Sequence, residues 1–425
     1  MTASVRYRST GNRANDAESW SERFAAVMPF GSSTASKRPR LVPEEPEVIV
    51  RGDGCRVWDD RGREFIDFRN ALGPVTLGYR YPAVDDAIRA QLDRGIIFGH
   101  PSPLECEVAE RICQQLPGMD WARFLKTGGE AIAAAIRVAR SHTGREHVVQ
   151  VGYNGWLNSV GSGAATLPGS DTPATVAAGV PAGLAAVHHQ ARWNDLAQIE
   201  QILDEHPGQV AAVVVAADYA GLTEGATFYP QLRALLDRHG TLMILDEIVT
   251  GFRIAVGGVN EHFAANADLA VYGKGMANGM PIAVYGGRAE LMDSCGPDGA
   301  VISSTFGGEA LSLAATAACL DTYATTDVVG HLWRQGTALW DQVVSLFASY
   351  RIPLTVSGLP PCPVISATDD TPGILDTFLR AAYRHGVSLY RVSYVNLSHS
   401  DDDIAETVER LDRACADVAN VVNAR

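Results

Sequence analysis

Residues 241–287 read TLMILDEIVTGFRIAVGGVNEHFAANADLAVYGKGMANGMPIAVYGG. The stretch holds three short apolar runs with the length of buried strands, at residues 241–245, 269–272 and 282–286. The first run ends at Asp246-Glu247, and the second ends at a lysine between two glycines, Gly273-Lys274-Gly275. Ligand sites in open α/β sheets gather beyond the carboxyl ends of the strands. The stretch therefore predicts a sheet with an acid and a lysine at its ligand-binding edge.

The central part of the chain continues this alternation of strands and helices. Further strands are expected at residues 123–125, 148–151 and 210–216, and helices at residues 82–92, 104–116, 130–140, 193–203 and 229–239. Apolar strands that alternate with helices are typical of a mostly parallel sheet with helices on both faces. The predicted fold class is therefore α/β.

The two ends of the chain follow a different pattern. Residues 55–59 and 64–68 flank an Asp/Gly turn and predict a β-hairpin. After Thr305, helices alternate with short strands, which indicates a smaller α+β domain that the hairpin joins. We expect a mobile N-terminal tail at residues 1–16 and the large domain at residues 71–325. The small domain is expected in two pieces, an N-terminal part at residues 17–70 and a C-terminal part at residues 326–425.

The composition excludes several classes of partner. Lys and Arg total 35 against 49 Asp and Glu, and the net charge of −14 argues against nucleic acid and anionic membranes. No apolar run approaches the roughly 18 residues of a membrane span. Residues 1–16 lack the apolar core of a secretory signal. Seven cysteines without a CxxC pair fit a reducing compartment, so we expect a cytoplasmic protein.

Two polar clusters suggest metal binding at first sight, the pair His188-His189 and the run Asp401-Asp402-Asp403. A turn explains the histidines more simply. A helix N-terminus, which favours acidic side chains, explains the aspartates. We therefore expect no metal site.

The acid and the lysine each have a plain interpretation when taken alone. Asp246 and Glu247 are typical of a helix cap or a solvated loop, and a single lysine is usually a surface charge. Lys274 stands at a strand end, however, where its flanking glycines let other groups approach. A lysine in a desolvated site can lose its proton and form a Schiff base with a carbonyl.

Two further motifs follow strands. Thr127-Gly128-Gly129 is a turn before a helix, and backbone N–H groups at a helix N-terminus form an anion site. Many strand-to-helix loops look alike, so this motif is weak by itself. Tyr153 and Asn154 follow another strand, and the aromatic ring is either simple core or a stacking partner for a flat ligand.

Together the four motifs meet the demands of pyridoxal 5′-phosphate (PLP). The phosphate requires a helix N-terminus, the ring a stacking partner, the pyridinium nitrogen an acid, and the aldehyde a lysine. The sequence therefore predicts a PLP enzyme.

At these motifs the chain resembles the class III, fold-type I PLP-dependent aminotransferases, and within them the glutamate-1-semialdehyde aminomutase-like branch. The resemblance runs from Ser19 to the C-terminus. It rests on Val57-Trp58-Asp59 with Gly62 and Asp67, on residues 126–131, 153–155 and 245–253, on residues 272–275 with Pro281, and on residues 305–308. It implies a mostly parallel seven-stranded sheet with helices on both faces, together with a smaller α+β domain.

The resemblance also implies roles for the candidate residues. Lys274 would form the Schiff base and carry the proton during catalysis. Asp246 would keep the pyridinium nitrogen protonated, and Tyr153 would stack on the ring.

The phosphate would be held by Thr127, Gly128 and Gly129. In the family, the residue that matches Thr305 reaches the phosphate from the partner subunit. The resemblance therefore implies a homodimer with shared active sites.

Three positions depart from the family pattern. The family often has Ser or Thr where Gly129 stands, and usually His where Asn154 stands beside the stacking tyrosine. The Glu-Pro that usually follows the strand at residues 213–215 is replaced by Ala216-Ala217-Asp218-Tyr219. Because family members place a polar side chain near the 3-oxygen of the ring from this region, we expect Asp218 or Tyr219 to serve there. Asn154 stays among the expected cofactor residues.

The same cofactor residues serve several reactions, which differ in where the proton returns. We expect an aminotransferase that moves an amino group from a donor such as glutamate to the carbonyl of a small polar metabolite. The alternative is an epimerase or a 2,1-aminomutase that uses Lys274 in the same way. The segment 305–309 resembles relatives that act on amino sugars or other secondary metabolites, as in antibiotic biosynthesis, with Glu309, Asp218 and Tyr219 as candidate substrate contacts.

Two other classes of protein fit less well. A catalytically silent relative would not need Lys274 and Asp246, which are both intact. A nucleotide-binding Rossmann enzyme would need a longer glycine motif than the GxG at residues 161–163.

Overall fold

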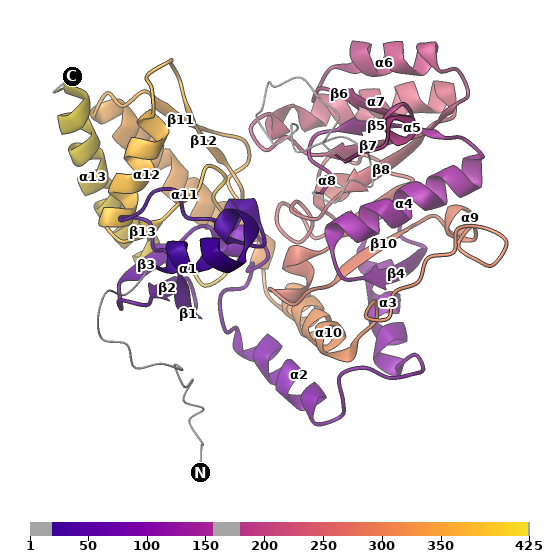
Figure 1. Cartoon of the computed structure of the whole chain (residues 1–425), viewed down its shortest axis with the longest axis horizontal. Coiled ribbons are helices and arrows are strands. Elements are labelled where there is room, and N and C mark those ends of the chain that lie inside the picture. Colours follow the sequence, from indigo (N-terminus) through magenta and orange to yellow (C-terminus); the bar gives the residue numbers. More distant parts are fainter. Residues whose placement is uncertain (1–18, 156–178, 424–425) are drawn as a thin grey trace.

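The computed structural model describes residues 19–155 and 179–423. Its larger part is built on a seven-stranded sheet, and its smaller part on a four-stranded sheet that packs with helices (Figure 1). The expected tail at residues 1–16 and the GxG at residues 161–163 lie outside the described residues.

The large sheet has the strand order β4-β10-β9-β8-β7-β5-β6. Its strands are β4 (Trp121–Leu125), β5 (His147–Val151), β6 (His188–Ala191), β7 (Val210–Ala216), β8 (Leu242–Asp246), β9 (Leu269–Tyr272) and β10 (Ala283–Gly287). Strands β6, β5, β7, β8 and β9 pair in parallel, whereas β10 is antiparallel to both β9 and β4. The sheet is therefore mostly parallel, and the predicted fold class is confirmed.

Strand β7 shows why the sheet carries helices on both faces. All seven side chains of its sequence VAAVVVA are buried. Ala212 and Val214 belong to the apolar core under α4 (Gly128–Thr143). Val213 and Val215 belong to the core under α7 (Gly225–His239). Because side chains alternate along a strand, a strand covered on both faces is apolar at every position.

The other helices of the larger part are α2 (Pro82–Leu92), α3 (Pro103–Gln115), α5 (Ala182–Ala185), α6 (Leu196–Glu205), α8 (Gly258–His262), α9 (Ala289–Met292) and α10 (Ala310–Thr325). Helix α2 matches its predicted range. Helix α4 begins at Gly128, earlier than predicted, because Thr127 and Glu130 form a capping box. The capping signature T-x-x-E is visible in the sequence and would have placed this helix start correctly.

The sequence predicts a turn at His188-His189, and this prediction is wrong. Both residues lie on β6, which pairs in parallel with β5 through Val148 opposite His188 and Val149 opposite His189. The strand HHQA is short, polar and at the sheet edge, so its conformation is set by pairing with β5 and not by an apolar alternation. The aspartate run at residues 401–403 does form the first turn of α13 (Asp401–Asn423), as predicted.

The smaller part joins the two ends of the chain. Strands β1 (Ile49–Asp53), β2 (Arg56–Asp59) and β3 (Glu64–Asp67) are antiparallel neighbours, and β13 (Val387–Ser388) pairs in parallel with β3. Around this sheet lie α1 (Trp20–Val27), α11 (Val328–Ser349), α12 (Ile374–Arg384), α13 and the hairpin of β11 (Leu354–Ser357) with β12 (Val364–Ala367). The predicted N-terminal hairpin is present. The domain boundaries at residues 70 and 325 stay predictions.

The long helices of the smaller part are amphipathic. Helix α11 buries Leu332, Leu339 and Val343, which recur at helical spacing on one face. Throughout residues 19–155 and 179–423, no helix combines the length and the apolar character needed to cross a bilayer.

Candidate active site

The candidate residues lie where neighbouring strands end. Asp246 is the last residue of β8, and Lys274 follows β9 after a single glycine. The register places Ala216, Asp246 and Val271 opposite one another on β7, β8 and β9. Tyr153 lies just beyond the end of β5. The parallel strands therefore bring these residues to the carboxyl edge of the sheet, where ligand sites of α/β proteins form.

Glycines let the surrounding loops pack closely. A β-carbon on Gly128 would lie 2.9 Å from Ile248 Cδ1, and one on Gly273 would lie 3.0 Å from the same atom. Gly155 has a φ of +95°, and a β-carbon on it would lie 3.1 Å from Gly129 Cα. The loops after β4, β5, β8 and β9 therefore meet at distances that favour glycine. They form one site.

Lys274 has an unusual backbone conformation and a desolvated amine. Its φ is 45°, in the left-handed region that side-chain-bearing residues rarely occupy. A β-carbon on Gly73 would lie 3.7 Å from Lys274 Cδ. Burial lowers the pKa of Lys274 to about 8, against the opposing charge of Asp246 and with a smaller contribution from Arg253. A large share of this amine is therefore neutral at mildly alkaline pH, and the neutral form attacks carbonyls.

Asp246 is the acid that belongs to the site. Its Oδ1 accepts the N–H of Ile248 at 3.1 Å. Burial raises the pKa of Asp246 to about 6, while this hydrogen bond and the Lys274 charge oppose the shift. Partial burial raises the pKa of the Tyr153 phenol, and Asp246 adds to this shift. The carboxyl group thus interacts with both the lysine and the aromatic residue.

The adjacent Glu247 has a structural task. Its buried carboxylate accepts the hydroxyl of Thr250 and the N–H groups of Val259 at 2.9 Å and Asn260 at 2.8 Å. These N–H groups lie in the first turn of α8, so Glu247 caps that helix. The plain interpretation of the acidic pair is therefore right for Glu247.

The N-terminus of α4 is shaped as an anion site. Glu130 Oε2 accepts the N–H groups of Lys126 at 3.1 Å and Thr127 at 2.9 Å, and the Thr127 hydroxyl oxygen accepts the N–H of Glu130 at 3.3 Å. Among the described residues, the Thr127 hydroxyl donates no hydrogen bond, so its proton can serve an acceptor. Gly128 and Gly129 occupy the first turn, where the helix dipole favours negative charge.

Asn154 shapes the loop that carries Tyr153. It is buried, and its Nδ2 donates to the carbonyls of Val151 at 3.2 Å and Gly152 at 3.4 Å. Within the described part of the chain, its Oδ1 is buried without a donor. Asn154 therefore fixes the turn beyond β5 and leaves one acceptor for a bound group.

The two candidates for the 3-oxygen of the ring have different surroundings. Burial raises the pKa of the Tyr219 phenol well above its usual range, and Asp246 is among the groups that act on it. Asp218 Oδ1 accepts the N–H of Ala220 at 3.2 Å, and its charged neighbours are Arg391 and Glu224. Tyr219 is thus under the electrostatic influence of Asp246, and the choice between the two residues stays a prediction.

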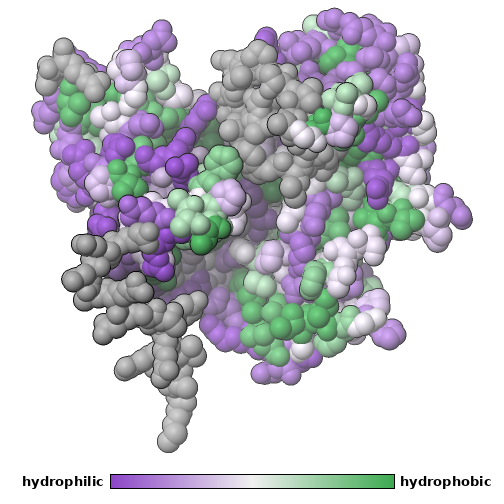
Figure 2. Space-filling view, in the orientation of Figure 1, coloured by the Kyte–Doolittle hydropathy of each residue, from purple (hydrophilic) through white to green (hydrophobic). Residues whose placement is uncertain are grey.

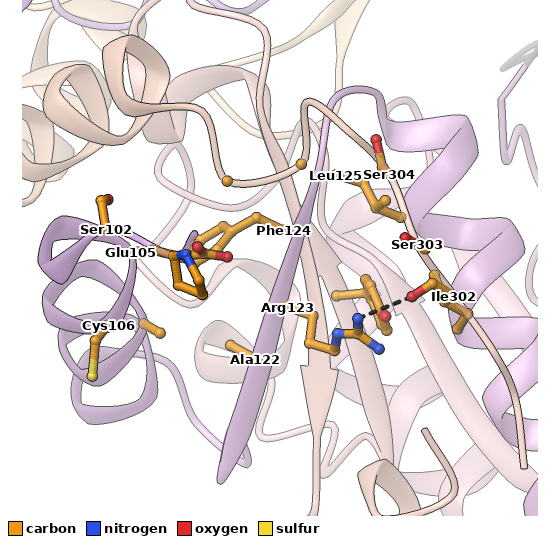
Figure 3. A pocket seen from close by; sticks show the side chains of 15 residues that line it. Ser102, Glu105, Cys106, Ala122, Arg123, Phe124, Leu125, Ile302, Ser303 and Ser304 are labelled. Atoms are coloured by element: carbon orange, nitrogen blue, oxygen red, sulfur yellow. Dashed lines mark hydrogen bonds between the residues drawn. The ribbon is translucent and has the colours of Figure 1, made fainter. Parts of the chain in front are cut away.

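Thr305 lies in the loop before α10. It is exposed, and in the described residues its hydroxyl makes no hydrogen bond. Residues on both sides of it, at 302–304 and 307–308, border a cavity of about 360 Å³ beside β4 (Figure 3). Figure 3 shows Arg123 donating to the Ile302 carbonyl, at 2.9 Å, which ties the segment to β4. Lys274 does not line this cavity.

Arg253 is a site residue to which the sequence assigns no role. It is 1% exposed, donates to the carbonyls of Gly73 at 2.6 Å and Val395 at 3.1 Å, and lies over the Tyr394 ring at 4.7 Å. It therefore joins the loop after β8 to both ends of the chain, close enough to influence the pKa of Lys274. The sequence feature that could have identified Arg253 is a charged residue between the apolar residues Phe252 and Ile254.

The residues present fit PLP. The glycine-rich start of α4 suits a phosphate, and β-carbons on Gly128 or Gly273 would crowd Ile248 and narrow the site. Lys274 supplies an amine of lowered pKa, and Asp246 supplies an acid for the ring nitrogen.

Comparison with known proteins agrees with this geometry. The family described as aminotransferase class-III matches residues 40–415. The glutamate-1-semialdehyde 2,1-aminomutase of Acetivibrio thermocellus is 32% identical over 418 residues, which cover 92% of this chain and 95% of the relative. The enzyme of the same name from Nitratidesulfovibrio vulgaris is 33% identical over 413 residues, which cover 91% of this chain and 96% of the relative.

Solved structures show the same fold. The FumI protein of Sphingopyxis sp., solved in its PLP internal aldimine form, has a TM-score of 0.83 and 27% identity, with 95% of this chain and 97% of that chain covered. A glutamate-1-semialdehyde aminomutase from Pseudomonas aeruginosa has a TM-score of 0.77 and 21% identity, with 94% and 93% covered, a likeness of fold alone. The resemblance drawn from the sequence motifs is therefore confirmed: the chain belongs to the class III aminotransferases, a fold-type I family that uses pyridoxal phosphate.

Proposed function

We propose that the protein binds PLP at the carboxyl edge of its large sheet and uses it to move an amino group on a small amine or carbonyl substrate. The observation that carries the proposal is the meeting of Lys274 and Asp246 at the ends of β9 and β8, beside the glycine-rich start of α4. An amine of low pKa, a carboxyl group and an anion cradle are what this cofactor requires. Membership of the class III family supports the same conclusion.

Each residue then has a defined task. PLP, when bound, supplies an electron sink that weakens a bond next to the substrate nitrogen. Lys274 would hold the cofactor through its amine, and the same amine would hold and move the proton. Asp246 pairs with the ring nitrogen and keeps it protonated. Tyr153 would cover the ring, and the N–H groups of Gly128 and Gly129 would hold the phosphate.

For the reaction itself, an aminomutase-type isomerase is the first candidate. The curated relatives named glutamate-1-semialdehyde 2,1-aminomutase, at 32% and 33% identity, support it over nearly the whole chain. An aminomutase moves nitrogen between neighbouring carbons of one substrate and needs no separate acceptor. The relatives thus favour the reaction that the sequence motifs alone placed second.

Transamination is the second candidate. The segment 305–309, TFGGE, supports it, because this segment resembles relatives that act on sugars or other secondary-metabolite carbonyls. The corresponding substrate would be a small polar carbonyl compound, with glutamate as the nitrogen donor.

One of the expected substrate contacts, Glu309, already has partners within the chain. Glu309 caps α10, where its Oε1 accepts the N–H of Ser312 at 2.9 Å and the Lys126 ammonium at 2.7 Å. Its carboxylate is therefore occupied inside this chain. The substrate contacts proposed at the end of β7 then rest on Asp218 and Tyr219.

The proposal that PLP binds through Lys274 can be tested directly, because the chain contains only three lysines, Lys37, Lys126 and Lys274. Borohydride reduction of the purified protein should fix PLP to the peptide that contains Lys274, as read by mass spectrometry. Lys274→Ala should abolish this adduct, and Lys37→Ala, at an exposed site, should retain it. Reduction products on Lys37 or Lys126 alone would overturn the proposal.

A second experiment separates the two reactions. Glutamate 1-semialdehyde serves as the probe, because the relatives are named for it. An aminomutase converts it to the isomer with the amino group on the neighbouring carbon, without any keto acid and with total amine conserved. A reaction that starts only when a keto acid is added, and that consumes the acid in equal amount, contradicts the aminomutase assignment.

We propose further that the active protein is a homodimer. Phe306, which follows Thr305 in sequence, is an exposed apolar residue. Three more exposed apolar residues, Ile96, Ile97 and Phe98, lie in a second segment of the chain. The two segments are adjacent, since the N–H of Ala310 donates to the Ile96 carbonyl at 2.8 Å. Figure 2 shows hydrophobic side chains gathered over the lower part of the larger domain. A second copy on this surface would cover the apolar residues and let Thr305 reach the partner's phosphate site.

Light scattering tests the dimer. The expected mass is twice the 45.4 kDa of one chain. Phe98→Asp with Phe306→Asp should shift the protein toward the monomer and weaken PLP binding, because each site would lose its neighbour. A monomeric wild-type protein with full PLP affinity would refute the assembly without touching the cofactor claim.

A further inference from the structure

Three histidines converge at the edge of the large sheet opposite the active site. In the described residues, one ring nitrogen from each of His147, His189 and His206 lies within 4.8 Å of the other two. His147 Nδ1 and His189 Nε2 are 2.8 Å apart. The ring centroids are 5.1 Å apart for His147 and His189, and 4.5 Å for each of the pairs that include His206. The three rings therefore form one compact cluster.

The backbone holds these histidines in place. His147 begins β5, and His189 lies on the neighbouring strand β6. His206 follows the last turn of α6, and its carbonyl accepts the N–H of Gln209 at 3.1 Å. The carbonyl of Gln209 in turn accepts the N–H of His147 at 3.0 Å. The ligand atoms are thus presented by two paired strands and a hydrogen-bonded helix end, which loses little freedom on binding.

The cluster is separate from the PLP site. His147 stands at the amino end of β5, whereas Tyr153 lies beyond its carboxyl end. A five-residue strand puts ~13 Å or more between these two positions. A ligand at the histidines can therefore be studied without disturbing the residues around Lys274.

The surroundings of His147 and His189 favour the neutral form of these two rings. Burial lowers the pKa of His147 and, more strongly, that of His189, to about 4, and the neighbouring imidazoles add to both shifts. Arg140 also lowers the pKa of His147, while Glu146 and Glu205 act in the opposite direction. Neutral imidazole is the form that binds metal ions.

We propose that His147, His189 and His206 form a binding site for one divalent first-row transition-metal ion, with Zn²⁺ as the reference case. Imidazole nitrogens suit such ions, and three histidines with an open fourth position are a recurrent zinc arrangement. Zinc–nitrogen bonds of ~2.0–2.1 Å imply ligand nitrogens about 3.3 Å apart in a tetrahedral site. The nitrogens of His147 and His189, which are 2.8 Å apart, would need to move apart slightly, and the nitrogen of His206 already lies within 4.8 Å of both. Water, or the exposed carboxylate of Glu146 or Glu205, would take the fourth position.

A purely structural role, in which the histidines only form hydrogen bonds within the protein, explains less of the cluster than a metal site does. The hydrogen bond between His147 and His189 explains one pair but not the approach of His206. His188 shows the contrast, because it has its own partners: its Nδ1 lies 2.8 Å from the Leu184 carbonyl, and its Nε2 lies 3.2 Å from Arg140. The proposal revises the expectation that the histidine pair has no part in metal binding, since one member, His189, belongs to the cluster.

The bound ion would join the edge strand β6 and the turn after α6 to β5. An ion that binds only the folded chain raises its thermal stability. We therefore expect Zn²⁺ to raise the Tm of the PLP-loaded protein and to bind with a stoichiometry of one per chain.

The test uses untagged, PLP-loaded protein that has been treated with a chelator and then dialysed. Isothermal titration with Zn²⁺ should give one site per chain with an affinity on the order of micromolar or tighter. His147→Gln, His189→Gln and His206→Gln should each weaken binding at least about tenfold. His142→Gln, at an exposed histidine outside the cluster, should leave it unchanged.

A second readout does not depend on the variants. Co²⁺ in place of Zn²⁺ should give the intense visible absorption of a low-coordinate site, and Zn²⁺ should displace it. The PLP absorption should not change, because the two sites lie at opposite edges of the sheet. Zinc binding that survives in His206→Gln, or the absence of both a Tm shift and a cobalt spectrum in the wild-type protein, overturns the proposal.

Discussion

The backbone of Gly128 lies against the side chain of Ile248, so that a β-carbon on Gly128 would come within 2.9 Å of both Cδ1 and Cγ1 of Ile248. Ile248 also limits the space at Gly273, next to the lysine. It follows Asp246 closely in sequence and receives no other role. One apolar side chain thus sets the spacing between the anion cradle, the acid and the lysine.

Gly128→Ala should therefore disturb the cofactor site, because the added methyl group must displace Ile248. We expect PLP to bind at least about tenfold more weakly, a loss of about 1.4 kcal/mol. Equilibrium dialysis or absorbance titration of the apo-protein measures the change. Gly129→Ala is the matched control, since a β-carbon there meets no atom within 4 Å. Equal affinities for the two variants would show that Ile248 does not set the spacing.

Gly129→Ser tests the missing hydroxyl of the family pattern. The open space at Gly129 admits the side chain without displacement. A serine at the helix start adds a hydroxyl donor to the phosphate. PLP should bind several-fold more tightly, roughly the effect of one hydrogen bond to a charged group. An affinity no better than that of Gly129→Ala would contradict a phosphate at this helix start.

The capture of PLP by the apo-protein should depend on pH through Lys274. Its pKa is lowered to about 8, and the neutral amine is the reactive form, so the rate rises as the pH increases through this value. Asp246→Asn should move the midpoint to lower pH, because the Asp246 charge opposes the lowering. Stopped-flow absorbance gives the profile. A midpoint near the ordinary lysine pKa would mean that Lys274 is not desolvated.

Asp246 and Glu247 should respond differently to the same chemical change. Asp246→Asn removes the acid that keeps the ring nitrogen protonated, so kcat should fall by a factor of about 10² to 10³. Glu247→Gln removes an acceptor from the first turn of α8, and the free energy of unfolding should fall by about 1–3 kcal/mol with a smaller effect on kcat. Urea unfolding and steady-state kinetics on both variants separate the two roles. A large loss of stability in Asp246→Asn together with a large loss of kcat in Glu247→Gln would contradict the roles assigned to the two acids.

Much of the fold was accessible from local sequence patterns. The sequence predicts strand β7 with the bounds that the structure shows, because a strand buried on both faces has an apolar side chain at every position. It does not predict the edge strand β6, because the four residues of this strand carry no such pattern and its conformation depends on pairing with β5. Periodicity identifies elements that bury their own side chains, and it fails for those that a neighbour holds.

The candidate site divides in the same way. Asp246 and Lys274 follow apolar strands and could be placed at a sheet edge from sequence. The task of Glu247 depends on where α8 begins, and the cluster that includes His206 depends on two strands and a helix end. These contacts join residues far apart in sequence. No local pattern records them.

Arg253 is buried and connects the larger part of the molecule to the smaller part through its hydrogen bonds. Arg253→Lys keeps the charge but loses the planar fork that reaches both Gly73 and Val395. Leaving one or both carbonyls without a donor should lower the free energy of unfolding by at least about 2 kcal/mol, measured by urea titration. The exposed Arg238→Lys should cost less than about 0.5 kcal/mol. Arg253→Met should also raise the pH midpoint of PLP capture, since Arg253 contributes to the lowered pKa of Lys274. An Arg253→Lys protein as stable as the wild type would show that the two parts are held together elsewhere.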